Sequence, residues 1–587
     1  MEKQDQNPKS VALIIGVTGI SGLSLAEALK NPTAQGSPWK VYGAARRPPP
    51  SWFPTALVDR YITFDALDSA DTALKLSLIS QEITHLFSVP LHAQESEEVN
   101  IFKNSTMLKN VLSVLVNLCL TREVPFKEDS PRLPFPNFYY ELEDVAASYS
   151  PAITYSVHRS SVIIGASPRS VYNSLLTLAV YATICKYQGL PFRYFETAIN
   201  SVYVICDMEK QDQNPKSVAL IIGVTGISGL SLAEALKNPT TPGSPWKVYG
   251  AARRPPPGWF PTALVDRYIT FDALDPADTA LKLSLISQEI TNLFWVPLQV
   301  QESEEVNIFK NSTMLKNVLS VLVSSNSGRS RLRHVALLTG TKHYMGPIFD
   351  PSLAGQLMPY EVPFKEDSPR LPFPNFYYEL EDVAASYSPA ITYSVHRSSV
   401  IIGASPRSLY NSLLTLAVYA TICKYQGLPF RYFGNKYTWE HFFDVSDSRL
   451  LAEQQIWAAT TDKAKNQAFN CTNGDVFMWK SLWKLLSEIF DIEFVPFDDV
   501  KNEKFDVVEM MKEKGEIWDE IVEKHGLYKT KLEEITCFEA MKLVLHFEFQ
   551  HVSSMNKSRE FGFFGFVDTM KSIRMWVGKL REMKIIP

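Results

Sequence analysis

The distribution of apolar and polar residues along this chain shows one pattern twice, at Val11–Gly22 and at Val218–Gly229. In each copy a run of apolar residues enters a turn that carries three glycines, and a helical pattern, LSLAEALKN, follows. An uninterrupted apolar run of this length is typical of a strand that is buried on both faces. The pattern therefore predicts a buried strand, a tight turn and a helix, in that order.

More strands and helices are predicted between the second pattern and Gly434. The expected strands are residues 218–222, 247–254, 267–275, 291–298, 334–344 and 392–403, and the expected helices include residues 228–237 and 304–322. Strands that alternate with helices over this length indicate the α/β class, with a doubly wound parallel sheet of the Rossmann type.

The glycine-rich turn is the first candidate for chemistry. A strand, a turn with three glycines and a helix N-terminus form the arrangement that holds a pyrophosphate on backbone N–H groups. We therefore expect a dinucleotide site, and its predicted residues in the turn are Gly223, Thr225, Gly226, Ile227 and Gly229. A purely structural turn is the alternative.

Residues at the ends of the next two strands predict which dinucleotide binds. Arg253 and Arg254 follow the second strand, where an acidic residue would favour NAD and a basic one favours the 2′-phosphate of NADP. Guanidinium groups suit that phosphate by charge and by bidentate geometry. Asp272 follows the third strand, where it could meet the adenine edge. A solvated basic pair and an ordinary acidic loop residue are the alternatives.

The composition changes after Gly434 to an aromatic, mostly helical pattern. The helical periodicities cover Ser448–Thr460, Trp479–Phe490, Val507–Lys512, Phe538–Phe547 and Val567–Met583. We expect residues 208–434 to be mainly the NADP-binding part, and residues 435–587 to be mainly a substrate or lid part over an apolar ligand. The alternative is that these aromatic residues only form core.

An internal repeat decides the domain organisation. Residues 1–116 realign on residues 208–323, and residues 123–195 realign on residues 361–433. Between the two matches, copy 1 reads NLCLTR where copy 2 carries Ser324–Tyr360. The missing segment includes the fifth predicted strand.

We therefore expect residues 1–207 to be a truncated duplicate of the dinucleotide-binding domain, and residues 208–587 to be the complete unit. Copy 1 keeps the equivalents of the glycines and arginines, and of one tyrosine: Gly16, Gly19, Gly22, Arg46, Arg47 and Tyr139. Because a parallel sheet without an internal strand leaves backbone groups unpaired, copy 1 is predicted to be inactive. A fusion of neighbouring coding segments, with Met208 as a true start, is the alternative to a duplication.

Charge and composition exclude several classes of protein. The formal net charge of −5 over 587 residues, without a basic stretch, argues against a nucleic-acid partner. The longest apolar runs, such as Ser412–Cys423, are too short to span a membrane. The six cysteines form no C-x-x-C pair, which predicts a reducing, cytoplasmic location and no metal site.

A lysine and a tyrosine are the candidate catalytic residues. Lys342 lies at the end of the fifth predicted strand, where ligand chemistry gathers in such sheets. The Tyr-x-x-x-Lys pattern of ordinary short-chain reductases fails at Tyr377 and Tyr378, which have Glu381 and Asp382 four residues later. If a tyrosine and a lysine act together, Lys342 is therefore the candidate lysine.

Several motifs in copy 2 resemble those of the plant progesterone 5β-reductase/iridoid synthase family. These motifs are GVTGISG, AARRP, LLTGTKHYMGP, NFYYELED, YSVHR, GNKYTWEHFFDVSD and EFQHVSSMNKSREFGFFGF. The resemblance implies an atypical short-chain reductase that uses NADPH to reduce the C=C bond of an enone. It places the catalytic lysine at Lys342 and the catalytic tyrosine at Tyr377. The spacer before YSVHR is short, and Ser398 stands where the family has proline.

The mechanism implied by this resemblance is stabilisation of an enolate. Hydride addition to the β-carbon places negative charge on the carbonyl oxygen, which Tyr377 and Lys342 would stabilise. His343 and His396 are interpreted as structural or orienting residues. The expected partner is a small-molecule enone, with a homodimer as the assembly to test. A non-catalytic NADPH sensor and an ordinary short-chain carbonyl reductase are the alternatives.

Overall fold

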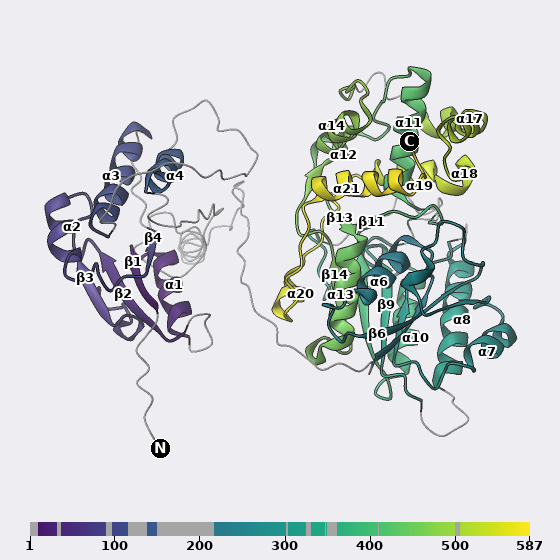
Figure 1. Cartoon of the computed structure of the whole chain (residues 1–587), viewed down its shortest axis with the longest axis horizontal. Coiled ribbons are helices and arrows are strands. Elements are labelled where there is room, and N and C mark those ends of the chain that lie inside the picture. The colour runs from purple at the N-terminus through teal and green to yellow at the C-terminus, as the bar shows by residue number, and fades with distance from the viewer. Residues whose placement is uncertain are drawn as a thin grey trace, which may run out of the picture. The chain divides into compact units, whose positions relative to one another are not determined.

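The computed structural model describes residues 10–31, 37–89, 97–115, 138–149, 217–300, 303–323, 330–346, 348, 361–408, 410–498 and 505–587. The chain forms two compact units, residues 1–204 and residues 205–587, here called unit 1 and unit 2 (Figure 1). No helix among the residues described is both long enough and apolar enough to cross a membrane.

Unit 1 contains a four-stranded parallel sheet. Its elements are β1 (Ser10–Ile15), α1 (Ile20–Lys30), β2 (Trp39–Ala45), η1 (Thr55–Leu57), β3 (Arg60–Thr63), α2 (Ser69–Leu76), β4 (His85–Ser88), α3 (Glu97–Leu115) and α4 (Phe138–Ser148). The strand order is β3-β2-β1-β4. Within the described part of unit 1, β4 is therefore an edge strand, and its residues are only half-buried or exposed.

Unit 2 contains a seven-stranded parallel sheet. The elements that build it are β5 (Ser217–Ile222), α6 (Ile227–Lys237), β6 (Trp246–Ala252), η2 (Thr262–Leu264), β7 (Arg267–Thr270), α7 (Pro276–Leu283), β8 (Asn292–Trp295), α8 (Glu304–Val323), β9 (His334–Gly340), α9 (Lys342–Met345), α10 (Phe376–Ser386), β10 (Thr392–Ser398) and β14 (Gln467–Cys471). The strand order is β14-β10-β9-β8-β5-β6-β7. The order reverses between β5 and β8, the switch point beside which ligands bind in open parallel sheets.

Helices cover both faces of this sheet. One apolar layer joins the strands to Leu283 of α7, Leu315 of α8 and Leu380 of α10. The opposite layer joins them to Leu232 of α6 and to Ile456 of α13 (Ser448–Thr460). A sheet covered on both faces explains why its strands are continuous apolar runs. The predicted α/β fold with a Rossmann-type parallel sheet is thus confirmed.

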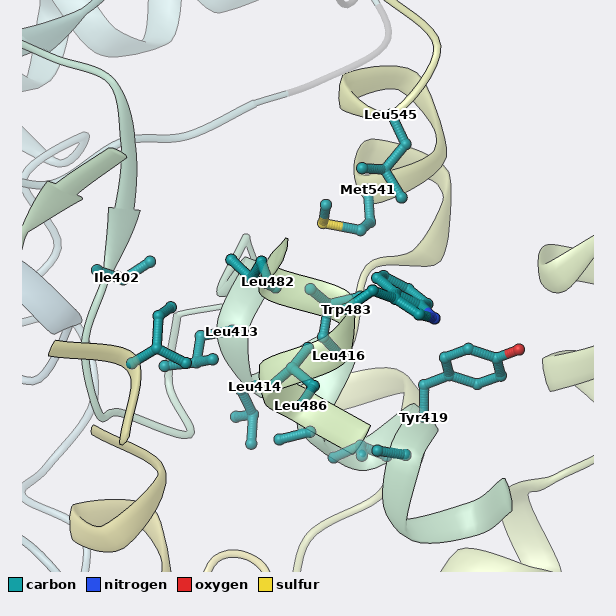
Figure 2. Packing of buried hydrophobic residues seen from close by; sticks show 14 of the residues in the cluster. Ile402, Leu413, Leu414, Leu416, Tyr419, Leu482, Trp483, Leu486, Met541 and Leu545 are labelled. Carbon is teal, nitrogen blue, oxygen red and sulfur yellow. The ribbon is translucent and has the colours of Figure 1, made fainter. Parts of the chain in front are cut away.

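The C-terminal part of unit 2 is mostly helical and has its own core. Its further elements are β11 (Val400–Ile402), α11 (Ser412–Gln426), α12 (Lys436–Glu440), β12 (Phe442–Phe443), β13 (Val445–Asp447), η4 (Asp462–Ala464), β15 (Phe477–Met478), α14 (Trp479–Phe490), α16 (Val507–Lys512), α17 (Gly515–His525), α18 (Leu532–Ile535), α19 (Phe538–Val544), α20 (Asn556–Glu560) and α21 (Thr569–Glu582). Figure 2 shows how Leu413, Leu416 and Tyr419 of α11 pack near Leu482 and Trp483 of α14.

The structure differs from the predicted elements at several places, and three of the differences affect the region around Lys342 and the main sheet. The fifth strand ends at Gly340, because Thr341 has helical backbone angles (φ −62°, ψ −12°) and begins the short helix α9. The predicted strand 392–403 is divided, and residues 400–402 pair with β13 instead of the main sheet. The segment after Gly434 also supplies β14, which pairs with β10 and extends the main sheet.

Candidate active site

A groove lies at the carboxyl ends of the strands in unit 2. It is lined by Ile222, Gly223, Thr225, Ala252, Arg253, Arg254, Phe271, Asp272, Ala273, Pro297, Leu298, Gln299, Met314 and Arg407. Five residues predicted to bind a dinucleotide therefore meet in one place, namely Gly223, Thr225, Arg253, Arg254 and Asp272. They come from the ends of three neighbouring strands.

The glycines of the turn have separate structural roles. Gly223 has a φ of +89°, in the left-handed region that a side chain disfavours. A Cβ on Gly229 would lie 2.2 Å from the Gly223 carbonyl oxygen, so only glycine lets α6 pack so closely on the turn. Gly226 and Ile227 begin α6, and the Ile227 N–H donates to the Ser408 hydroxyl at 2.9 Å. Gly226, Ile227 and Gly229 thus lie beside the groove and do not line it.

Three arginines line the groove. Arg253 and Arg254 are exposed, and neither has an ion-pair partner among the described residues. Arg407 reaches the same groove from the loop after β11 and donates to the Pro255 carbonyl at 3.0 Å. Burial, and then the nearby charge of Arg254, lower the pKa of Arg407. Arginines that have no ion-pair partner among the described residues are suited to an anion such as a phosphate.

Arg407 was not predicted from the sequence. It lies far from Arg253 and Arg254 along the chain, and the loop that carries it has no glycine pattern. The loop is held over the turn by the Ser405 hydroxyl, which donates to the Thr225 carbonyl at 2.7 Å. The one feature of the sequence that could have indicated Arg407 is that it is a basic residue in the loop after the sixth predicted strand.

Asp272 is held by its local loop. Its backbone N–H donates to Asp278 at 2.8 Å, and its Oδ1 accepts from the Leu274 N–H at 3.0 Å. These bonds keep the carboxylate at the rim of the groove after β7. A ligand that fills the groove can therefore meet it without rearranging the loop.

Lys342 is the first residue of α9 and is 3% exposed. Its Nζ donates to Glu304 Oε1 at 2.5 Å and lies 4.1 Å from the centroid of the Phe376 ring. Burial lowers the pKa of Lys342 to about 8, although the Glu304 carboxylate acts in the opposite direction. At neutral pH this lysine is therefore a buried cation that can lose its proton just above neutrality.

Glu304, which the sequence did not indicate, connects three helices. It begins α8, it accepts from Lys342 of α9, and its Oε1 also accepts from the Phe376 N–H of α10 at 2.8 Å. The carboxylate is nevertheless almost fully buried, at 8% exposure. A buried carboxylate needs such partners, because an unpaired one would be costly.

Tyr377 lies in the first turn of α10 beside α9. The Asn375 side chain caps α10 by accepting from the Tyr377 N–H at 3.0 Å, and it donates to the Lys342 carbonyl at 3.0 Å. The tyrosine ring reaches the end of β9, where a Cβ on Gly340 would lie 3.2 Å from the hydroxyl oxygen. The absence of a side chain on Gly340 leaves the hydroxyl its space.

The Tyr377 hydroxyl has no hydrogen-bond partner among the residues that the structure describes. Burial, and then the negative charge of Glu304, raise its pKa above the ordinary value. The phenol therefore stays protonated across the neutral range, and its proton is available to an acceptor outside the protein.

Tyr378, the next residue, is engaged in structure. Its hydroxyl donates to the His343 carbonyl at 2.6 Å and accepts from the Leu371 N–H at 3.0 Å. The two adjacent tyrosines thus differ in one respect that matters for chemistry. Of these two hydroxyls, only that of Tyr377 lacks a hydrogen-bond partner among the described residues.

The predicted histidines lie in buried networks. His343 Nδ1 is 3.2 Å from Glu381 Oε1, and His396 Nδ1 lies 2.8 Å from Gln454 Oε1. Burial lowers the pKa of both, to about 4 for His396, so neither is a ready proton donor at neutral pH. These contacts agree with the structural interpretation.

A third buried histidine, His551, braces the turn before Lys342. Its Nε2 lies 2.9 Å from Thr341 Oγ1, and its Nδ1 lies 3.2 Å from Asp444 Oδ1. Asp444 also accepts from the Ser553 N–H at 2.6 Å. The C-terminal segment thereby supports the end of β9, a role that no pattern in the sequence indicated.

The site can be compared with known proteins. A family model described as a PRISE-like Rossmann-fold domain matches residues 274–587. (S)-8-Oxocitronellyl enol synthase CYC2 from Camptotheca acuminata is 45% identical over 384 residues, which cover 64% of this chain and 96% of the relative. The 3-oxo-Delta(4,5)-steroid 5-beta-reductase of Arabidopsis thaliana is 45% identical over 393 residues, which cover 66% and 98% of the two chains. A solved structure, UDP-N-acetylglucosamine 4-epimerase from Methanobrevibacter ruminantium, aligns with a TM-score of 0.42 and 14% identity over 62% of this chain and 98% of its own.

Proposed function

Because the chain belongs to the family with a PRISE-like Rossmann-fold domain and is an oxidoreductase, we propose that unit 2 reduces the C=C bond of an enone with NADPH. The family membership confirms the resemblance predicted from the motifs. The names of the two relatives, an enol synthase and a steroid 5-beta-reductase, support an α,β-unsaturated carbonyl compound as the substrate class. The proposed substrate is a small-molecule enone, and the proposed location is the cytoplasm. A homodimer is the assembly to be tested.

The groove supports NADPH as the cofactor. Arg253 and Arg254 have no carboxylate partner in the described residues, and Arg407 adds a third positive charge beside them. These guanidinium groups would hold the 2′-phosphate, and the turn at Gly223 would hold the pyrophosphate. Asp272 lies at the rim where the adenine would enter. When bound, NADPH would supply the hydride for the reduction.

The observation that carries the proposed reaction is a phenol, Tyr377, that has no hydrogen-bond partner among the described residues and lies in the turn that Asn375 and Glu304 tie to the buried cation Lys342. As the enone accepts a hydride at its β-carbon, negative charge develops on the carbonyl oxygen. Tyr377 would donate its hydroxyl proton in a hydrogen bond to that oxygen, and the charge of Lys342 would strengthen the stabilisation. The α-carbon can then be protonated by solvent or by the tyrosine.

Adjacent tyrosines provide a matched experiment on the full chain. Tyr377→Phe should lower turnover of a small cyclic enone by about 10²–10³-fold, the usual cost of losing one oxyanion donor. Its melting temperature should barely change, because the hydroxyl has no partner among the described residues. Tyr378→Phe should lower stability by about 1–2 kcal/mol, because it leaves two backbone groups unpaired, and should keep most of the activity.

The assay is NADPH consumption followed by analysis of the product. A saturated ketone supports the proposal, whereas an allylic alcohol would indicate an ordinary carbonyl reductase. If the unaltered chain binds NADPH and turns over none of a panel of enones, the reductase proposal is wrong. A non-catalytic NADPH-binding protein would then be the better description.

A further inference from the structure

Unit 1 repeats the glycine turn of unit 2 in the same conformation. Gly16 has a φ of +85°, against +89° for Gly223. The Gly16 N–H donates to the Ala44 carbonyl at 2.8 Å, as the Gly223 N–H does to that of Ala251. A Cβ on Gly22 would lie 2.3 Å from the Gly16 carbonyl oxygen, the same close packing of helix on turn. The duplicated sequence therefore folds into a duplicated glycine turn.

The basic end of the groove is also repeated. Arg46 and Arg47 follow β2, are exposed, and have no ion-pair partner among the described residues. The carbonyl of Arg47 accepts from the Tyr61 hydroxyl at 2.9 Å, and that of Arg254 accepts from Tyr268 at 2.8 Å. The backbone that carries the two arginines is thus held by the same bond in both units.

The end of the third strand is the last matching element. The Asp65 N–H donates to Asp71 at 2.8 Å, and Asp65 Oδ1 accepts from the Leu67 N–H at 3.1 Å. These bonds repeat those of Asp272 in unit 2 within 0.1 Å. Phe64 beside it is 4% exposed, as is its equivalent Phe271. Three strand ends of unit 1 therefore present the equivalents of Gly223, Arg253, Arg254 and Asp272, whereas the counterpart of Arg407, Arg169, lies outside the described residues.

The strand and the lysine that the reaction would require have no equivalent in unit 1, although Tyr139 corresponds to Tyr377 in the sequence. Copy 1 reads NLCLTR where copy 2 carries Ser324–Tyr360, so the sequence contains no counterpart of β9 or of Lys342. In the described residues the sheet of unit 1 ends at β4. The part of the site that β9 and Lys342 supply in unit 2 is therefore missing from the sequence of copy 1.

We propose that unit 1 is a second nucleotide site, which binds the adenosine 2′-phosphate end of NADP(H) and catalyses no reaction. The inference rests on the proposed function, because the twin groove in unit 2 is there assigned to NADPH. Two guanidinium groups would meet the 2′-phosphate, and the N–H groups of the glycine turn would meet the 5′-phosphate. Unit 1 would bind 2′,5′-ADP and NADPH with equal affinity, whereas unit 2 would favour the complete dinucleotide.

Isothermal titration of the full chain with 2′,5′-ADP tests this inference by stoichiometry. We expect two equivalents per chain. Arg46→Ala with Arg47→Ala should weaken one of them at least about tenfold, as expected for lost charge-assisted hydrogen bonds, and should leave enone reduction unchanged. Arg253→Ala with Arg254→Ala should weaken the other. Arg60→Ala is the control, because it removes an exposed arginine from the opposite end of β3.

The outcomes separate the two proposals. One equivalent in the unaltered chain, lost with Arg253 and Arg254, would overturn the second site and leave the proposed reductase intact. One equivalent lost with Arg46 and Arg47 would support the second site and overturn the cofactor assignment in unit 2. The number of equivalents is measured on the unaltered protein, and thermal unfolding of each double variant shows that it is folded before its binding is compared.

Discussion

Glu304→Gln provides the sharpest test of the proposed charge arrangement at Lys342. The substitution keeps the shape of the side chain and an oxygen that can accept from the Phe376 N–H, now at 2.8 Å. It removes the negative charge 2.5 Å from Lys342 Nζ, which is the contribution that raises the lysine pKa against burial. We therefore expect the pKa of Lys342 to fall further.

The magnitude follows from the two opposing contributions. Burial outweighs Glu304 and brings the pKa of Lys342 from 10.5 to about 8. An opposite charge at such a distance typically shifts a pKa by about 1–3 units, so the variant lysine should titrate between about 5 and 7. At pH 7.5 Lys342 would change from mostly protonated to mostly neutral. The enolate would then lose the nearby positive charge.

The pH dependence of kcat/KM for an enone, at saturating NADPH, measures this change. The unaltered chain should lose activity as pH rises through about 8, and the descending limb of Glu304→Gln should move to lower pH by at least one unit. Glu379→Gln is the control, because it breaks an exposed pair with Lys316, at 3.1 Å, between the same helices α8 and α10. A descending limb that stays in place, or moves upward, would refute the assignment of the limb to Lys342.

Three further variants probe the surroundings of the site. Gly340→Ala places a Cβ 3.2 Å from the Tyr377 hydroxyl oxygen and 3.0 Å from the Ser398 carbonyl oxygen, so turnover should fall by about tenfold and the melting temperature should fall as well; unchanged turnover would contradict the contact with Tyr377. His551→Leu leaves the buried carboxylate of Asp444 with one partner fewer, so the free energy of unfolding, measured by thermal unfolding, should fall by about 1–3 kcal/mol. Equal stability would show that the contact between His551 and Asp444 is not needed. Arg407→Ala should raise the KM for NADPH by about tenfold and leave that for NADH unchanged; equal effects on both would exclude a contact with the 2′-phosphate.

Local patterns were enough to predict most elements of unit 2. The predicted helices Ser448–Thr460 and Val507–Lys512 agree with α13 and α16 to the residue. Each begins after an aspartate, Asp447 or Asp506, whose side chain accepts from the first turn of the helix. Such caps and amphipathic faces lie within a few residues of one another, so they can be recognised along the chain.

Elements that depend on distant pairing could not be predicted in this way. The strand β14 consists of five residues that pair with β10, which lies on the far side of α11 and α13 in the sequence. Nothing within Gln467–Cys471 shows that β10 has a free edge for it. The end of β9 at Gly340 similarly depends on Ser398, whose carbonyl accepts from the Thr341 N–H at 2.8 Å.

The sequence by itself determined the fold class, the family and the candidate pair Lys342 and Tyr377, because these depend on residues in short motifs and on their order. Tertiary structure alone decided the environment of that pair. Glu304 reads in the sequence as an ordinary acidic residue at a helix start, where solvent would cover it. The packing of α8, α9 and α10 instead buries it together with Lys342, so that burial lowers the pKa of the lysine and the carboxylate that binds it opposes that change.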